Sequence, residues 1–453
     1  MASLPVPHRA ARLELFRSAL DLGLGVPRLA WYILTRKRHK AAVEGDLAGP
    51  AAPVESPELG PLPERPLRIF VAAAEASGEA HAARLAQALT RLAVEAGAPP
   101  PELQGLGGEE LQAAGVHVLA DPGAQASMAL GGMRALPFYV DLIERSAKCW
   151  RDWRPDVFAP VDSPALFIPM ARTAKRYGLP TVHHIAPQFW AWAPWRVTRY
   201  KRYIQRALTI LPFEPAWHAR HGMPTGHVGH PLLDTLAELP APPAFDAPER
   251  RALILLPGSR RHEIDDNLPW MLSVADDLRA NLPEHPVLLL QSSRRHAQRL
   301  GELLDGRSDV ELRFGDLHRH LGEGRSALAV SGTVLTDVFH HRIPTVAIYR
   351  DTGLWKVRGR DLILTTPSFA SSNLVAGRQV VPEYLFRDDG PRAEVGRWLA
   401  QTWRDPGRRE TIARDLDQVA ERLGPAGASE RAARFILRAA AKQARQEADQ
   451  LPN

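Results

Sequence analysis

The sequence predicts an α/β protein with two parallel sheets of the Rossmann type, and two observations support this prediction. Short, continuously apolar segments alternate with helical ones, which is typical of strands covered on both faces by crossover helices. The alternation occurs in two series, separated by the proline-rich segment 239–243. A chain of 453 residues is long enough for both sheets, because domains usually have about 100–200 residues.

The first series defines an expected domain at 67–238. Its apolar and helical runs alternate in the order that a parallel sheet requires. Strands are expected at 68–74, 156–161, 181–185 and 207–211, and helices at 80–92 and 168–177.

The second series defines an expected domain at 239–395. Its first strand, 252–256, stops at Pro257 and leads into a helix that we expect to begin near Ile264. Further strands are expected at 286–290, 327–330 and 345–348. The Ala-, Arg- and Glu-rich stretch 392–446 predicts helices with a break at Gly424-Pro425, so that C-terminal helices are expected at 396–453.

Residues 1–45 form a basic and apolar N-terminal extension, and residues 46–66 form a linker rich in Pro, Gly, Ala and Glu. In the extension, the apolar run 29–34 leads into the basic cluster 36–40. This combination suits an anionic membrane surface. It also suits a helix that packs on the main body with its basic end in water, and both interpretations stay open.

The composition limits the partners. The net charge of +6 favours nucleic acid, an anionic membrane surface or a phosphorylated substrate, but no nucleic-acid recognition motif is present and nucleic acid is not expected. The single Cys149 excludes an intramolecular disulfide and indicates a reducing compartment. We expect a cytoplasmic protein, because we find neither a signal peptide nor an apolar run of membrane-spanning length. The histidines lack metal-ligand spacing, so no metal is expected.

Four polar loops follow expected strands, at the position where open α/β sheets bind ligands: 75–79, 162–164, 257–260 and 331–333. In the second domain, the 257–260 loop offers backbone N–H groups and the guanidinium of Arg260 to a phosphate. The 331–333 loop would donate to a diphosphate, and Asp337, one helical turn later, would accept from ribose hydroxyls. There are simpler explanations for each group. Arg260 is then solvated, the hydroxyls of Ser331 and Thr333 cap a helix, and Asp337 is an acid that the dipole favours in the first helical turn. The joint position of these groups favours a nucleotide site.

In the first domain, Asp162 is the best candidate for a general base. A carboxylate at the end of a buried strand can take the proton from an attacking hydroxyl. The alternative is an Asx-type turn with Ser163 and Pro164. The aromatic segment 185–196 either lines a cleft or packs between domains, and His230 is expected to be structural.

Taken in this order, the loops resemble those of the lipid-A-disaccharide synthase family, inverting glycosyltransferases of the GT-B fold. In that fold two Rossmann-like domains face each other across a cleft. The similarity extends from about Leu67 to about Leu385. Besides the four loops, it is carried by the segments 106–115, 154–162, 187–192, 211–214, 228–234, 255–263 and 373–383.

The resemblance implies transfer of an acylated glucosamine from its UDP donor to the 6-hydroxyl of an acylated glucosamine 1-phosphate. The products are a β-1,6 disaccharide and UDP, no cofactor is needed, and Asp162 is the implied general base. The implied location is peripheral, on the cytoplasmic face of the inner membrane. The residues implied to bind substrate are Ser77, Gly78, Glu79, Gly258, Ser259, Arg260, Glu263, Ser331, Gly332, Thr333, Asp337, Asn373, Gly377 and Arg378.

The sequence departs from the family pattern mainly on the acceptor side. Residues 162–167 keep the aspartate but read Asp-Ser-Pro-Ala-Leu-Phe in place of Asp-Ala-Pro-Asp-Phe-Asn, and 128–133 also differs. Glu79 replaces an aspartate and Asp337 a glutamate. These departures leave open a different lipid or sugar acceptor, or a homologue that binds lipid or nucleotide without catalysis.

Overall fold

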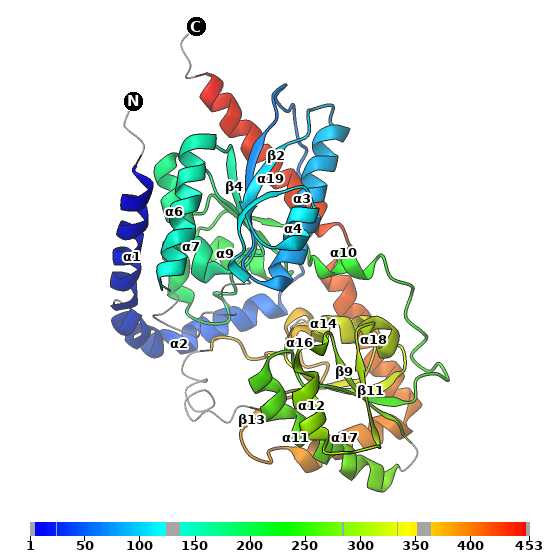
Figure 1. Cartoon of the computed structure of the whole chain (residues 1–453). Coiled ribbons are helices and arrows are strands. Elements are labelled where there is room, and N and C mark those ends of the chain that lie inside the picture. The colour runs from blue at the N-terminus through cyan, green and yellow to red at the C-terminus, as the bar shows by residue number, and fades with distance from the viewer. Residues whose placement is uncertain are drawn as a thin grey trace. The chain divides into compact units, whose positions relative to one another are not determined.

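The computed structural model describes residues 5–23, 25–123, 136–282, 285–332, 334–350 and 364–449. The chain forms two compact units (Figure 1). The first comprises the segment up to His39, Ala51–Asp234 and the chain from Gly424 on, and the second comprises Lys40–Pro50 and Thr235–Leu423. The residues expected as C-terminal helices, 396–453, are therefore divided between the two units.

The sheet of the first unit is parallel, with the strand order β3-β2-β1-β4, and two bridges connect β4 to the further strands β5-β6-β7. The chain order reverses between β1 and β4, and such a reversal places a ligand crevice at the carboxyl ends of the two strands. The strands are β1 (Arg68–Ala72), β2 (Glu102–Leu106), β3 (His117–Ala120), β4 (Val157–Pro160), β5 (Val182–His184), β6 (Arg206–Thr209) and β7 (Thr225–His227).

Aromatic side chains bind this sheet to its helices. Phe70 of β1 and Phe158 of β4 contact each other edge to face, and both lie against Trp150. Phe167 of α7 packs on Phe158. The helices of this unit are α3 (Ala76–Glu95), α4 (Glu109–Ala113), α6 (Leu136–Trp153), α7 (Pro164–Ala174), α8 (Val197–Tyr200), α9 (Glu214–Arg220) and α19 (Ala428–Ala448).

The second unit has a six-stranded parallel sheet with the order β10-β9-β8-β11-β12-β13. Its order reverses between β8 and β11, as that of the first sheet does between β1 and β4. The strands are β8 (Ala252–Leu256), β9 (Val287–Gln291), β10 (Val310–Phe314), β11 (Gly324–Val330), β12 (Thr345–Arg350) and β13 (Glu383–Phe386). The helices are α11 (Arg261–Asn281), α12 (Ala297–Leu304), α13 (Leu317–Leu321), α14 (Val334–His340), α16 (Ser371–Ala376), α17 (Arg392–Arg404) and α18 (Pro406–Leu423).

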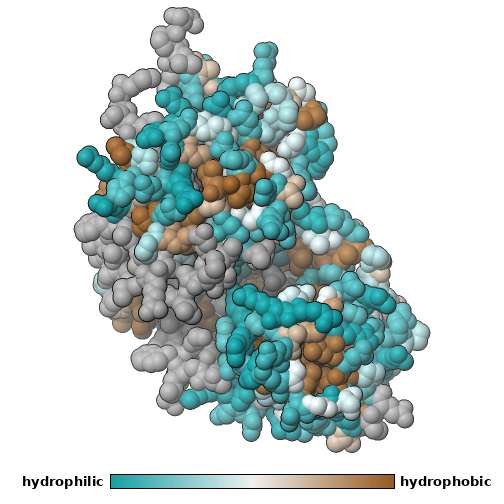
Figure 2. Space-filling model, viewed as in Figure 1, coloured by the Kyte–Doolittle hydropathy of each residue, from teal (hydrophilic) through white to brown (hydrophobic). Residues whose placement is uncertain are grey.

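The N-terminal extension forms two helices, α1 (Pro7–Gly23) and α2 (Gly25–Ala48). Packing on the main body is confirmed for α1, which contacts α6 and α7. A buried ion pair of 3.0 Å between Glu14 of α1 and Arg172 of α7 fixes this contact. No helix in the described part of the chain is long and apolar enough to cross a bilayer. On the face shown in Figure 2, the described surface is mostly hydrophilic, with apolar residues in separate patches.

The apolar-run pattern finds eight of the thirteen described strands and misses β2, β3, β7, β10 and β13. Four of these lie at the edges of their sheets, where half of the side chains meet water and the sequence is mixed, as in Val-Glu-Leu-Arg-Phe of β10. The expected start of α11 near Ile264 is wrong, since the helix begins at Arg261. The break at Gly424-Pro425 is confirmed by the end of α18 at Leu423.

Candidate active site

Asp162 lies at the carboxyl end of β4, beside the reversal of strand order in the first sheet. Its N–H donates to the carbonyl of His184 at 2.9 Å, so its backbone is held to β5. Asp162 and Ser163 have φ angles of +56° and +45°, in the left-handed region that Asp tolerates better than most residues. The chain therefore turns sharply out of β4 and begins α7 at Pro164, where a missing N–H costs nothing.

A buried histidine also fixes the backbone of Asp162. The Nε2 atom of His183 lies 2.8 Å from the Asp162 carbonyl oxygen, and its Nδ1 atom lies 3.0 Å from the hydroxyl of Tyr200. A carbonyl only accepts, so Nε2 carries the proton and the tyrosine donates to Nδ1. Burial lowers the pKa of His183 to about 4, which keeps the ring neutral at pH 7.

The electrostatic surroundings of Asp162 suit a base. Burial raises the pKa of its carboxyl, the N–H of Ser163 lowers it, and the negative charge of Glu75 raises it further. The net effect is a pKa above the ordinary value of 3.8, which makes the carboxylate a better proton acceptor.

The 75–79 segment meets Asp162 through its single glycine, Gly78. A Cβ atom at Gly78 would lie 3.6 Å from the Val161 carbonyl and 3.9 Å from the Asp162 Cβ, so the start of α3 lies directly against the aspartate. Ser77 is exposed in the same turn. The carboxylate of Glu79 accepts from the N–H groups of α4 at 2.9 and 3.3 Å and caps that helix, and its contact with a substrate stays a prediction.

In the second unit, the 257–260 loop has the conformation expected of an anion-binding loop, and an acid of the chain already occupies part of it. Gly258 has a φ of +106°, and a Cβ atom there would lie 2.6 Å from the carboxylate of Glu263. That carboxylate accepts from the N–H groups of Ser259 and Arg260 at 3.1 and 3.2 Å. Glu263 is thus the cap of α11, while 67 % of the Arg260 side chain remains exposed.

The 331–332 backbone follows β11 and is adjacent in the sheet to the loop after β8. The Ser331 hydroxyl donates to the Phe369 carbonyl at 2.9 Å, and Gly332 is exposed. Thr333 lies outside the described residues, as does the segment 128–133. The serine hydroxyl therefore already has an acceptor, and the contact of this loop with a diphosphate stays a prediction.

Asp337 occurs one turn into α14, and it is buried. Its carboxylate lies 3.4 Å from the Nε2 atom of His318, whose ring stacks on His341. Burial raises the pKa of Asp337 to about 7. The structure thus pairs Asp337 with a histidine of α13, and its contact with a ribose stays a prediction.

The comparisons with known proteins fit this arrangement of loops. A profile of the family described as lipid-A-disaccharide synthetase matches residues 69–400. The lipid-A-disaccharide synthase of Geobacter sulfurreducens is 33% identical over 390 residues, which cover 83% of this chain and 98% of the relative. The chain belongs to the lipid-A-disaccharide synthetase family.

Two further matches agree with this family assignment. The synthase of Acidobacterium capsulatum is 32% identical over 380 residues, covering 80% of this chain and 93% of the relative. The crystal structure of the calicheamicin glycosyltransferase CalG4 has a TM-score of 0.51 at 15% identity, covering 81% of this chain and 97% of that one. The structural match shows the fold alone. A synthetase of this family is a glycosyltransferase, and the two Rossmann-like units with C-terminal helices are those of the GT-B class.

Three residues that the resemblance to the synthetase family implies as substrate ligands make structural contacts in this protein. The side-chain amide of Asn373 is fully engaged with the 380–381 backbone, at 2.8 to 3.0 Å. Gly377 has a φ of +68° and ends α16 where the Leu47 carbonyl of α2 approaches too closely for a Cβ atom. Arg378 pairs with Asp415 of α18 at 2.7 Å. All three contacts connect elements of the second unit, and binding of the UDP by these residues stays a prediction.

The tryptophans of the aromatic segment 185–196 lie in two places, the buried core and a pocket. Trp190 is buried and donates to Glu214 at 2.9 Å, so it packs inside the first unit, and packing between domains stays a prediction. Trp192 and Trp195 instead line a pocket inside the first unit. His230 is buried, as a structural histidine should be. Within the described residues, no three His, Cys, Asp or Glu side chains form a group that could hold a metal ion.

Proposed function

We propose that this protein transfers an acylated glucosamine from a UDP donor to the 6-hydroxyl of an acylated glucosamine 1-phosphate, releasing UDP. Membership of the family supports the reaction class. The observation that carries the assignment to residues is the position of Asp162, a half-buried carboxylate at the switch point of the first sheet with a pKa above its ordinary value.

In this mechanism Asp162 takes the proton of the acceptor hydroxyl while the hydroxyl oxygen attacks the anomeric carbon of the donor. The bond from that carbon to the diphosphate oxygen breaks on the opposite face, so the configuration inverts. The negative charge that develops on the diphosphate is stabilised by Arg260 and by the N–H groups of the loops after β8 and β11. Both loops flank the switch point of the second sheet.

Substitution of Asp162 tests this assignment. Asn is the conservative variant, because it tolerates the left-handed backbone conformation. We expect Asp162→Asn to lower the rate of UDP release by about 10²-fold or more while binding of the UDP-sugar, measured by titration calorimetry, persists. The matched control is Asp141→Asn on the exposed face of α6, which should leave turnover unchanged.

Three results would contradict parts of the proposal. Undiminished turnover of Asp162→Asn would remove Asp162 as the base. If the unaltered protein releases UDP only with a different lipid or sugar acceptor, the reaction class stands and the acceptor is wrong. If it binds the UDP-sugar and releases UDP with none of the acceptors, it is a binding homologue without catalysis.

We also propose that the outer face of α2 contacts an anionic membrane. Trp31 and Leu34 are 68% and 79% exposed, and with Arg38 they follow the i, i+3, i+7 spacing of a single helix face. Exposed Trp and Leu beside basic residues is the pattern of an interfacial helix. Such a face would bring the synthase to the lipids on which it acts.

A further inference from the structure

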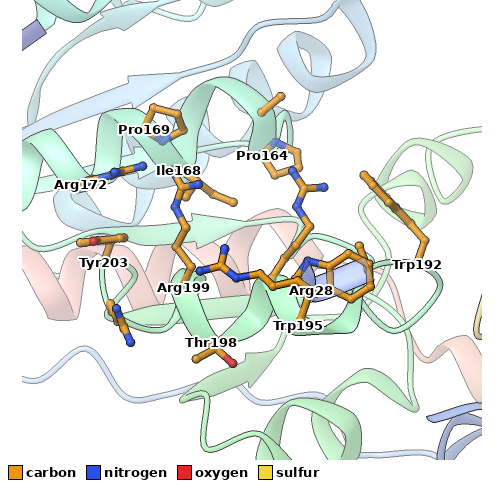
Figure 3. A pocket seen from close by; sticks show the side chains of 14 residues that line it. Arg28, Pro164, Ile168, Pro169, Arg172, Trp192, Trp195, Thr198, Arg199 and Tyr203 are labelled. Carbon is orange, nitrogen blue, oxygen red and sulfur yellow. The ribbon is translucent and has the colours of Figure 1, made fainter. Parts of the chain in front are cut away.

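The first unit contains a cavity of about 700 Å³ between α7 and the segment that leads into α8 (Figure 3). Pro164, Ile168 and Pro169 of α7 form one side, and Trp195 with Arg199 lies on the other. The cavity begins two residues after Asp162, at the first turn of α7. The lining residue Pro164 is therefore close in the sequence to the proposed base, Asp162.

The lining has an unusual charge. Of the fourteen described residues that line the cavity none is acidic, and five are arginines: Arg28, Arg172, Arg196, Arg199 and Arg202. Glu14 of α1, behind the lining, pairs with Arg172 and neutralises one of them. Arg28, Arg196 and Arg202 add positive charge to the lining, and the amino end of α7 adds the positive end of a helix dipole. Guanidinium groups and a helix start together are the donors that phosphate oxygens prefer.

The rest of the lining is apolar and aromatic. Arg196 stacks over the ring of Trp192 with its guanidinium carbon 4.7 Å from the ring centre, which orients the cation. Half-burial lowers the pKa of Arg196, so its charge is only partly solvated. Tyr203 and the proline and isoleucine side chains of α7 cover the rest of the lining. A cavity with several guanidinium groups between apolar walls suits a phosphate carried by an amphiphilic molecule better than a free phosphate ion.

One arginine comes from outside the family match. Arg28 is a residue of α2, and the profile of the family starts only at residue 69. One helical turn after Arg28, Tyr32 is buried with its ring centre 5.1 Å from that of Trp195, another lining residue. Residues four apart lie on one helix face, so the contact that anchors Tyr32 also directs the Arg28 face toward the cavity. The extension thus helps to build this cavity.

We propose that this cavity binds the phosphate of the acylated sugar-phosphate acceptor and that Arg28 of the N-terminal extension completes it. This inference rests on the proposed function, since it names a binding site for one substrate of that reaction. A sugar held here by its phosphate lies beside the turn at 162–164, where the base is. A phospholipid also carries a phosphate on an acylated molecule. The test therefore has to distinguish the sugar-phosphate acceptor from a phospholipid.

The experiment compares two acceptors in detergent micelles without phospholipid: the acylated glucosamine with its 1-phosphate and the same compound without it. For Arg28→Ala and Arg196→Ala we expect KM for the phosphorylated acceptor to rise about tenfold or more, because each loses a charge-assisted hydrogen bond. The ratio of kcat/KM between the two acceptors should fall accordingly. Arg12→Ala, an exposed arginine of α1, is the control with the same loss of charge and should keep that ratio.

A second measurement titrates the phosphorylated acceptor into the Asp162→Asn protein, where binding is read without turnover. Weaker binding by Arg28→Ala in that background supports the inference. An unchanged ratio of kcat/KM in both arginine variants overturns it. It is also overturned if Arg28→Ala weakens co-sedimentation with phosphatidylglycerol vesicles but leaves KM for the phosphorylated acceptor unchanged. The phosphate that Arg28 binds would then belong to a phospholipid headgroup. If the unaltered protein releases no UDP, the proposed function fails, and the titration still reports on the cavity.

Discussion

At the scale of single residues, Asp162 differs from the carboxylates that cap helices. Glu79, Glu263 and Asp234 accept backbone N–H groups at the starts of α4, α11 and α19. A carboxylate used in this way provides acceptors for N–H groups that have no partner inside the helix. Asp162 is instead half-buried near a second negative charge, that of Glu75, and its pKa rises. The contrast separates structural acids from the one poised to take a proton.

The influence of Glu75 on Asp162 gives a pH-dependent prediction. A base with a raised pKa loses activity as the pH falls through that pKa, because protonation removes the carboxylate. Glu75→Gln removes a charge that raises the pKa of Asp162, so the acid limb of kcat/KM should shift to lower pH. The control is Glu58→Gln, an exposed acid of the linker. An acid limb that does not move, or moves to higher pH, contradicts this account of the site.

Gly377 allows a direct choice between a structural and a substrate-binding role. Gly377→Ala puts a Cβ atom against the Leu47 carbonyl at a φ of +68°, and we expect a loss of about 1–3 kcal/mol in the free energy of unfolding, measured with urea. Gly396→Ala in α17 is the control, because nothing lies within 4 Å of its Cβ position, and it should gain up to about 1 kcal/mol. Unchanged stability of Gly377→Ala with a raised KM for the donor would restore the substrate role.

At the scale of elements, the start of α19 shows how the first unit holds a helix from the far end of the sequence. The carboxylate of Asp234 accepts from the N–H groups of Gly427, Ala428 and Ser429 at 2.6 to 2.9 Å. Burial raises the pKa of Asp234, but these hydrogen bonds outweigh burial and leave it below its ordinary value of 3.8. The helix then packs along α3.

We expect Asp234→Asn to lower the free energy of unfolding by about 1–2 kcal/mol near neutral pH, since it weakens a cap and removes a charge at the helix start. The sign of the pH dependence follows from the depressed pKa of Asp234. The stabilisation is present above the unfolded value and is lost as the pH falls through the folded one. Urea unfolding at a series of pH values should therefore be less pH-dependent for the variant.

The control for this cap is Asp449→Asn at the other end of α19, where a negative charge opposes the dipole and its removal should not destabilise. Equal losses in the free energy of unfolding for both variants would contradict this account. They would show that the removed charge, and not the geometry of the cap, determines the loss.

At the scale of the whole molecule, the N-terminal extension has two faces with different tasks. The inner face of α2 carries Arg28 and the buried Tyr32, and the outer face carries Trp31 and Leu34. One helix thus connects the cavity of the first unit to a candidate membrane surface. In the sequence the residues of the two faces are mixed, so the run 29–34 does not show the amphipathic pattern clearly.

The outer face predicts binding to anionic vesicles. Trp31→Ser with Leu34→Ser should weaken co-sedimentation of the full chain with phosphatidylglycerol vesicles about tenfold or more, because each apolar side chain contributes about 1.5–3 kcal/mol when buried. High salt should weaken binding of the unaltered chain by screening its basic residues. Val94→Ser, an exposed apolar residue of α3, is the control. Equal sedimentation of the double variant and the control would exclude this surface.

The sequence by itself determined most of the interior strands, their parallel arrangement and the loops at their carboxyl ends. These features follow from local patterns, since a buried strand is continuously apolar and a βα loop needs small and polar residues. Asp162 and the adjacent Gly78 were found in this way, and the structure places them in contact. Edge strands escape the same pattern because half of their side chains face water.

The tertiary structure decided what each polar side chain does. Glu79 and Glu263 are themselves among the expected ligands, and in the structure their carboxylates accept from N–H groups at helix starts. Asn373 turned out to be a connector of elements, and Arg28, 134 residues before Asp162, lines a cavity near it. A side chain's partner depends on which distant segments folding brings within about 3 Å, and local sequence does not contain that information.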